Sequence, residues 1–286
     1  MLSPELQKIL LQITIKSRRI AEQLAAGSQR TKFKSKGTSF AQVRRYDFSD
    51  DARSIHWGVT ARLRQPYTKI FDEERERMVI VLVDVSASLG VGANLKLKKD
   101  IATEIAAIIG FSAVKNGDKL GALFFSDGIE WFLPPRKGEK QALQLIAKML
   151  SIEPKSAQTN INIALEYLNS VFKKPCIVFL LSDFLVPNYD ENLQKTAHKH
   201  ELVGIRVHEK IEMELPSIGI AKITDVETGK TSYIDTENVR VRAAYTSKFL
   251  EREKFFLDTF KRINASTLSL AAHKNYLPDL LRFFRN

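Results

Sequence analysis

Two uninterrupted apolar runs dominate the pattern of hydrophobic and polar positions along the chain, Met78 to Val83 and Cys176 to Leu181. Each run is far shorter than the roughly 20 apolar residues that a membrane-spanning helix needs. A short apolar run of this kind is typical of a strand that is buried on both faces of a parallel sheet. Asp84 follows the first run directly, and Asp183 follows the second run after one serine.

Weaker patterns predict the remaining elements. Further strands are expected at residues 120–125, 129–133 and 202–207, with 129–133 as an antiparallel edge strand. Apolar residues at helical spacing predict helices at residues 5–25, 96–115, 141–150, 159–172, 190–199, 245–263 and 276–285. Residues 218–235 are expected to form a hairpin that turns at residues 227–230, and residues 27–45 are expected to form a loop.

Strands that alternate with helices indicate an α/β fold with a mostly parallel sheet and helices on both of its faces. We divide the chain into three parts on this pattern. Residues 1–77 hold an N-terminal helix and a basic segment, and residues 78–210 hold the α/β domain. Residues 211–286 hold a C-terminal hairpin and helices that complete or extend the same domain.

Composition places the chain among ordinary globular proteins. Of its 286 residues, 44% are hydrophobic and 27% are charged, which argues against bulk disorder. The N-terminus lacks the apolar core of a secretory signal. The single cysteine, Cys176, cannot form an internal disulfide. We therefore expect a cytoplasmic protein.

The chain has a formal net charge of +11, and much of it lies in residues 1–77, which carry 16 lysine and arginine against 9 aspartate and glutamate residues. Such a segment can face nucleic acid, an anionic membrane surface or an acidic protein. A solvated basic surface is the simpler interpretation, because no stacking-aromatic pattern, zinc knuckle or helix-turn-helix signature accompanies the charge.

Three loops at predicted strand ends or helix starts carry the candidate chemistry. Ligands in open α/β sheets bind at the carboxyl ends of the strands. The oxygen-bearing side chains in these loops are Asp84, Ser86, Ser88, Thr159 and Asp183. Two carboxylates and three hydroxyls are hard ligands, which suit Mg²⁺ best here, with Mn²⁺ or Ca²⁺ as alternatives. Each residue alone also has a simpler interpretation as a helix cap or turn residue.

These residues and several other motifs resemble known groups. Asp84-Val85-Ser86-Ala87-Ser88, Thr159 and Asp183 resemble the metal-ion-dependent adhesion site of von Willebrand factor A domains. The motifs that resemble the bacterial "domain of unknown function 58" family are Arg45 to Trp57, Thr60-Ala61-Arg62, Glu73-Glu74-Arg75, Leu215 to Gly219, Asp225 and Glu227-Thr228-Gly229. This chain has His56 where that family usually has aspartate, so the resemblance implies no role for that position.

The resemblance implies a von Willebrand factor A-like, Rossmann-type fold and a non-enzymatic role. Members of the family are often encoded beside MoxR-type AAA+ ATPases, and related adhesion-site domains act as adaptors for such ATPases. The partners implied are therefore a MoxR-type ATPase and a protein that offers an acidic residue. Function must still be argued from the site, since fold alone does not determine it.

A cluster of charges around one tryptophan precedes the domain. Its members are Arg45, Asp50, Asp51, Arg53, Trp57 and Arg62. They form either a second binding surface for a partner or a clasp of arginine–carboxylate pairs that joins the N-terminal segment to the core.

Two other functions stay open as alternatives. Asp84 after a core strand is superficially similar to the nucleophile of a metal-dependent hydrolase or phosphotransferase, although neither a phosphate-binding glycine loop nor a nucleophile elbow occurs. The basic N-terminal part leaves open a nucleic-acid or anionic-membrane binder, whose binding would weaken steeply with salt.

Overall fold

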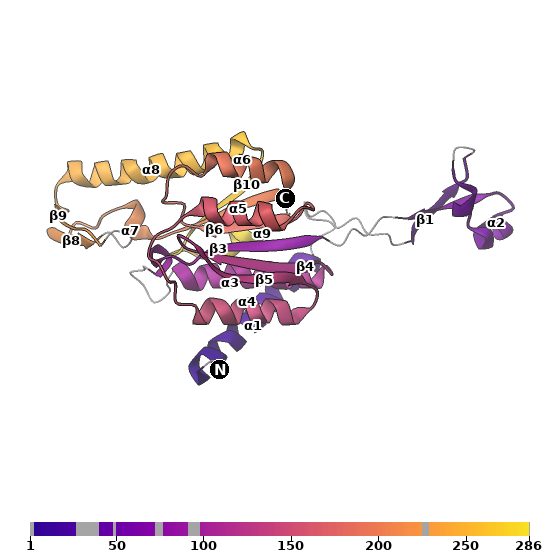
Figure 1. Ribbon diagram of the computed structural model, residues 1–286, viewed down its shortest axis with the longest axis horizontal. Coiled ribbons are helices and arrows are strands. Elements are labelled where there is room, and N and C mark those ends of the chain that lie inside the picture. The colour runs from indigo at the N-terminus through magenta and orange to yellow at the C-terminus, as the bar shows by residue number, and fades with distance from the viewer. Residues whose placement is uncertain are drawn as a thin grey trace. The chain divides into compact units, whose positions relative to one another are not determined.

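The computed structural model describes residues 3–26, 40–47, 50–71, 77–90, 98–224 and 229–285 (Figure 1). They belong to two compact units. The larger unit combines Met1–Thr31 with Met78–Asn286, and the smaller unit is Lys32–Arg77. The segment 1–77, which we treated as one part, is therefore divided, because its helix packs within the larger unit.

A six-stranded sheet forms the centre of the larger unit. Its strands are β3 (Met78–Asp84), β4 (Lys119–Phe125), β5 (Ile129–Arg136), β6 (Ile177–Ser182), β7 (Glu201–His208) and β10 (Ser266–Ala271). Their order across the sheet is β10-β7-β6-β3-β4-β5. Among these six described strands, only β5 is antiparallel to its neighbour, and it lies at one edge. The predicted α/β fold and the antiparallel edge strand are confirmed, whereas β10 was not predicted.

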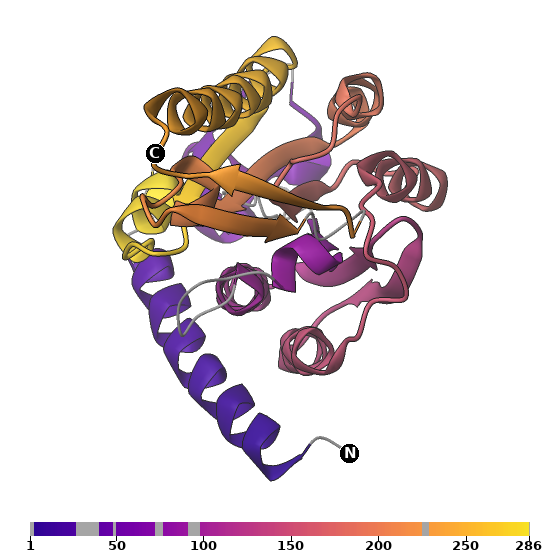
Figure 2. The same cartoon turned by 90° about the vertical axis from the view of Figure 1, so that its left-hand side faces the viewer.

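Helices cover both faces of this sheet (Figure 2). They are α1 (Pro4–Ala26), α3 (Lys98–Lys115), α4 (Glu139–Ser151), α5 (Ile161–Val171), α6 (Asp190–Lys199), α8 (Val239–Arg262) and α9 (Leu277–Arg285). Helices α3 and α4 contact one face, with α1 packed on α3. The other face forms a core with α5 and α8, in which Ile80, Leu82 and Phe256 are fully buried. Cover on both sides explains why β3 is apolar at consecutive positions.

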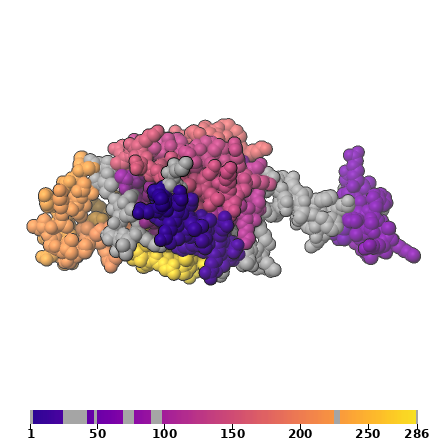
Figure 3. All heavy atoms as spheres, turned by 90° about the horizontal axis from the view of Figure 1, so that it is seen from below, coloured from indigo at the N-terminus to yellow at the C-terminus, as the bar shows by residue number. Residues whose placement is uncertain are grey.

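The amphipathic helix α1 packs its apolar side on the larger unit. Ile13, Ile20 and Leu24 are buried, and Lys16 forms an ion pair of 2.5 Å with Glu104 of α3. Figure 3 shows α1 on the surface of the larger unit, near the C-terminal segment. Among the described residues, no helix combines the length and the hydrophobicity that crossing a membrane requires.

An insertion between β7 and α8 extends the domain. It contains α7 (Lys210–Met213), β8 (Ile220–Thr224) and β9 (Thr231–Asp235). β8 and β9 pair as an antiparallel hairpin, as predicted, although part of the expected turn lies outside the described residues. Helix α8 begins at Val239, six residues before the predicted start at residue 245. Asn238 caps the helix, because its side chain accepts a hydrogen bond from the Arg240 N–H.

The smaller unit is built on one pair of antiparallel strands. Its elements are β1 (Phe40–Arg45), η1 (Ala52–Ser54), α2 (Trp57–Leu63) and β2 (Tyr67–Phe71). β1 and β2 pair as antiparallel strands. Residues 40–45 were expected to be part of a loop, and this expectation was wrong. The pairing joins segments that are more than 20 residues apart, so local patterning gave no sign of it. Residues 27–39 lie outside the described residues.

Close packing of α8 on β7 gives a first prediction. A Cβ atom at Gly204 would lie 2.5 Å from two ring atoms of Phe260 and 3.1 Å from Phe256. We expect Gly204→Ala to lower the free energy of unfolding by about 2 kcal/mol, because overpacked cores must shift to relieve such contacts. Urea denaturation measures this change. Gly128→Ala is the control, since nothing lies within 4 Å of its added Cβ. Equal stabilities of the two variants would refute the packing described.

Candidate metal centre

The predicted site lies where the order of the sheet reverses. From β3 the chain proceeds to β4 and β5 on one side, and it then returns to β6, β7 and β10 on the other. β3 and β6 are therefore neighbours, with Val83 opposite Leu181. Asp84 ends β3 and Asp183 directly follows β6. Such a switch point at the carboxyl ends of parallel strands is the usual ligand-binding position in open α/β sheets.

Hydrogen bonds from two serines hold Asp84 in place. Its side chain is completely buried. The Ser86 N–H donates to Oδ1 at 3.0 Å, and the Ser182 hydroxyl donates to Oδ2 at 2.7 Å. Ser182 in turn accepts a bond of 3.1 Å from the Phe184 N–H. Ser182 thus orients the first carboxylate, a role that sequence reasoning missed because it treated this serine only as the residue before Asp183.

A tight turn after β3 brings the two predicted serines together. The 3₁₀ helix η2 (Ala87–Gly90) follows Asp84, and the Ser86 and Ser88 hydroxyl oxygens lie 3.1 Å apart. Both side chains are buried. Their hydroxyl oxygens are therefore adjacent on the turn that directly follows Asp84.

The loop that carries Thr159 lies beside this turn. The Ala87 N–H donates to the Ala157 carbonyl at 3.3 Å, and the Asn160 N–H donates to the Ser126 carbonyl at 2.8 Å. Asn160 is the cap of α5, since its Oδ1 accepts from the Asn162 N–H. Capping therefore does not account for Thr159. Its Oγ1 is buried and has no hydrogen-bond partner among the described residues.

Asp183 has a partner that the sequence did not reveal. The ammonium of Lys98, at the start of α3, donates to Asp183 Oδ2 at 2.9 Å and to Glu212 Oε1 of α7 at 2.5 Å. Lys98 is completely buried. Asp183 Oδ1 accepts from the Leu185 N–H at 3.3 Å. The predicted acidic ligand is thus engaged at both oxygens.

Burial and neighbouring charges shift the titration of these groups. Burial, together with repulsion from Asp183, raises the pKa of Asp84 to about 7. The hydrogen bonds from Ser86 and Ser182 act in the opposite direction and lower it in part. Burial alone would lower the pKa of Lys98, but attraction to Asp183 and Glu212 outweighs it and raises that pKa above its ordinary value. The two carboxylates therefore favour the charged form of Lys98 despite its burial.

The donor set fits a hard divalent cation. Two carboxylates and three hydroxyls are oxygen ligands of the kind that Mg²⁺, Mn²⁺ and Ca²⁺ take. The Thr159 Oγ1, which has no hydrogen-bond partner in the described part of the chain, is an oxygen available for a further ligand. Within the described part of the chain, no three His, Cys, Asp or Glu residues gather as a metal site. A cation here would therefore depend on the hydroxyls.

The second predicted cluster lies in the smaller unit. Arg44 pairs with Asp50 at 2.5 Å, and Asp51 caps η1 by accepting from the Arg53 N–H. Trp57, 71% exposed, begins α2, and Arg45 and Arg62 are exposed in β1 and α2. His56 caps α2, its Nδ1 accepting from the Val59 N–H at 3.3 Å. The clasp to the core and the partner-binding surface both stay predictions.

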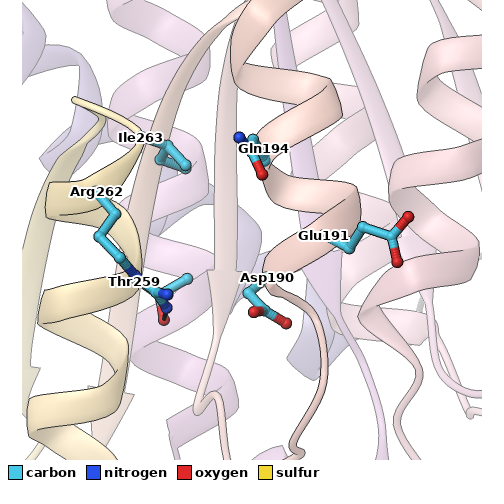
Figure 4. A pocket seen from close by; sticks show the side chains of 6 residues that line it. All are labelled: Asp190, Glu191, Gln194, Thr259, Arg262 and Ile263. Carbon is cyan, nitrogen blue, oxygen red and sulfur yellow. Dashed lines mark hydrogen bonds between the residues drawn. The ribbon is translucent and has the colours of Figure 1, made fainter.

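A separate hollow of about 370 Å³ lies between α6 and α8 (Figure 4). Its lining residues are Asp190, Glu191, Gln194, Thr259, Arg262 and Ile263. Asp190 and Glu191 come from α6 and Arg262 from α8, and in Figure 4 the Glu191 side chain points away from Arg262. It contains none of the predicted site residues.

Residues 42–254 match the family described as "Protein of unknown function DUF58". The chain belongs to this family. The uncharacterized protein Rv1480 of Mycobacterium tuberculosis is 29% identical over 251 residues, which cover 86% of this chain and 78% of that protein. The predicted family is confirmed.

Two solved structures are similar at low TM-scores. An aerotolerance-related membrane protein from Bacteroides fragilis has a TM-score of 0.47 and 12% identity, over 73% of this chain and 96% of that one. The SpRpn10 VWA domain has a TM-score of 0.41 and 10% identity, over 72% of this chain and 94% of that one. These values assign no function to the chain.

The raised pKa of Asp84 gives a second prediction. A carboxyl group of this kind favours folding while protonated, so its contribution is full below the ordinary pKa of 3.8 and is lost as the pH rises through about 7. We compare melting temperatures in EDTA. The melting temperature of Asp84→Asn minus that of the unsubstituted protein should increase from pH 5 to pH 8, because only the unsubstituted protein loses this contribution. Asp258→Asn, which removes an exposed charge on α8, is the control. A melting difference for Asp84→Asn that does not vary with pH would disprove this reasoning.

Proposed function

We propose that this chain is a non-enzymatic adaptor that binds an acidic group of a protein partner through one divalent cation. The cation, with Mg²⁺ as the first choice, would be held by Asp84, Ser86, Ser88, Thr159 and Asp183. The observation that carries the proposal is the buried Thr159 Oγ1, which has no partner among the described residues and belongs to the loop beside the two serines. A buried hydroxyl without a partner is costly unless something binds it.

The chemistry of the ligands favours binding of an external carboxylate. Hydroxyls are neutral and leave much of a cation's charge uncompensated, so a bound cation would attract an acidic group from outside. Ser86 and Ser182 hold Asp84 through hydrogen bonds, which fixes its orientation before any cation arrives. These residues bind and orient, and the proposal requires no reaction.

The serine contacts favour binding over nucleophilic catalysis. A catalytic serine is activated by an adjacent base. Here the Ser86 and Ser88 hydroxyls are hydrogen-bonded to each other. This contact concerns serine nucleophiles only. The metal-dependent hydrolase or phosphotransferase, in which Asp84 would be the nucleophile, stays the alternative.

The partner and the location belong to the same proposal. The family resemblance suggests a MoxR-type AAA+ ATPase as partner, with a role in the assembly or maturation of protein complexes. The single, buried cysteine is compatible with the reducing cytoplasm. The basic N-terminal segment is the reason to keep a nucleic-acid or membrane surface as an alternative.

Capture of the MoxR-type ATPase encoded in the same genome tests the proposal. We expect the immobilised chain to retain this ATPase in Mg²⁺ and to lose about tenfold or more of it in EDTA or with Asp84→Ala, because one coordinated carboxylate contributes more than about 1.4 kcal/mol. Asp258→Ala, an exposed position on α8, is the matched control and should retain it. Equal capture in Mg²⁺, in EDTA, with Asp84→Ala and with Asp258→Ala would exclude cation-dependent binding. Capture that depends on charge attraction alone is lost in high salt, because salt screens exposed charges.

A further inference from the structure

Lys98 is a completely buried lysine whose charge the proposed binding reaction does not use. Buried lysines are rare unless paired, because removing an ammonium from water is costly. Its ammonium lies between two carboxylates from distant parts of the chain, Asp183 after β6 and Glu212 in α7. Lys98 therefore connects the candidate metal centre to the insertion that follows β7.

At one end, the ammonium occupies an oxygen that a cation would use. Asp183 Oδ2 accepts from Lys98, and Oδ1 accepts from the Leu185 N–H. A divalent cation that binds Asp183 directly must share Oδ2 with the ammonium, displace the ammonium or replace the Leu185 bond. Two cations beside one buried carboxylate repel each other strongly, because the interior screens charge poorly.

At the other end, the ammonium is bound to a residue that organises α7. Glu212 Oε1 accepts from Lys98, and its Oε2 accepts from the Glu209 N–H at 3.1 Å. The next contact leads to α8, since the Tyr245 hydroxyl donates to the Ile211 carbonyl at 3.0 Å. Figures 1 and 2 show α7 and the β8–β9 hairpin together at one end of the larger unit.

The hairpin beyond α7 presents an exposed apolar surface. Ile218, Ile220 and Tyr233 are each more than two-thirds exposed. A movement of α7 would reposition this surface, because α7 and β8 are joined by only a short segment.

We propose that Lys98 acts as a tethered cation that competes with the divalent cation for Asp183, and that its shift toward Glu212 transmits occupancy of the metal centre to α7 and the β8–β9 hairpin. Lys98 is a positioning residue in this scheme, and the scheme rests on the proposed function. It adds that cation affinity is limited from within the chain and that the hairpin responds to the bound cation.

Titration with Mn²⁺ alone, followed by electron paramagnetic resonance of the free ion, tests the competition. We expect Lys98→Met to bind Mn²⁺ about tenfold or more tightly than the unsubstituted chain, because a competing positive charge is removed. Lys99→Met is the matched control, since the Lys99 ammonium is bound to the Ile152 carbonyl instead, and it should change the affinity less than about twofold.

A second variant gives the opposite sign and does not remove the buried cation. In Glu212→Gln, the ammonium loses its ion pair with Glu212 and keeps the one with Asp183, so we expect Mn²⁺ to bind about threefold or more weakly. A general loss of structure would weaken binding in both variants. Opposite signs for Lys98→Met and Glu212→Gln therefore support competition, and unchanged or weaker binding in folded Lys98→Met overturns it. If Lys98→Met does not fold, Glu212→Gln decides, provided that its melting temperature without metal equals that of the unsubstituted chain: weaker binding then supports competition, and unchanged or tighter binding overturns it.

Hydrogen exchange tests the transmission. Adding Mn²⁺ to the unsubstituted chain should change amide exchange in residues 209–224 and 229–236, and the change should be absent in Glu212→Gln at saturating Mn²⁺. No change in the unsubstituted chain despite Mn²⁺ binding overturns the transmission. If neither the unsubstituted chain nor Lys98→Met binds Mn²⁺ more tightly than Asp84→Asn does, the proposed function itself fails. If binding depends on Asp84 but not on Lys98, only this inference fails.

Discussion

Two buried carboxylates at the ends of neighbouring strands impose the main constraint on this molecule. Asp84 and Asp183 repel each other where little water can screen them, and buried charges must be paired or neutralised. Two buried cations contact Asp183: the Lys98 ammonium pairs with its carboxylate, and the Arg206 Nε–H donates to its main-chain carbonyl. Asp84 receives only neutral hydrogen bonds, from Ser86 and Ser182. A proton compensates this carboxylate at low pH, and in the proposed function a divalent cation would take its place, held also by the surrounding hydroxyls.

The fold produces this constraint through its topology. β3 is the first strand of this sheet along the chain, and it pairs with β4 on one side and with β6 on the other. The carboxyl ends of β3 and β6, which are distant in sequence, therefore become adjacent. The strands themselves are apolar and covered on both faces, so the end of the sheet is where polar side chains converge. The proposed adaptor role would benefit from this arrangement, since rigid strands would fix the proposed ligands while the insertion after β7 remains at the surface of the same end.

The sequence predicted what local patterns encode. Continuous apolar runs identified β3 and β6, and a polar amphipathic pattern identified α6 with its observed bounds. β10 was missed because Ser266, Thr267 and Ser269 interrupt its apolar residues, and the start of α8 was missed because valine and arginine alternate there as in a strand. Lys98 could not be predicted, since its partners are 85 and 114 residues away and only the folded chain brings them together.

The central claim is that one cation joins these oxygens at the end of the sheet. Anomalous diffraction from a crystal of the chain equilibrated with Mn²⁺ measures this directly. Our account predicts one manganese peak within bonding distance of the oxygens of Asp84 and Thr159 and of at least one of Ser86 and Ser88. Manganese bound only elsewhere on the chain, or no peak while Thr159 Oγ1 is occupied by another protein group, would contradict it.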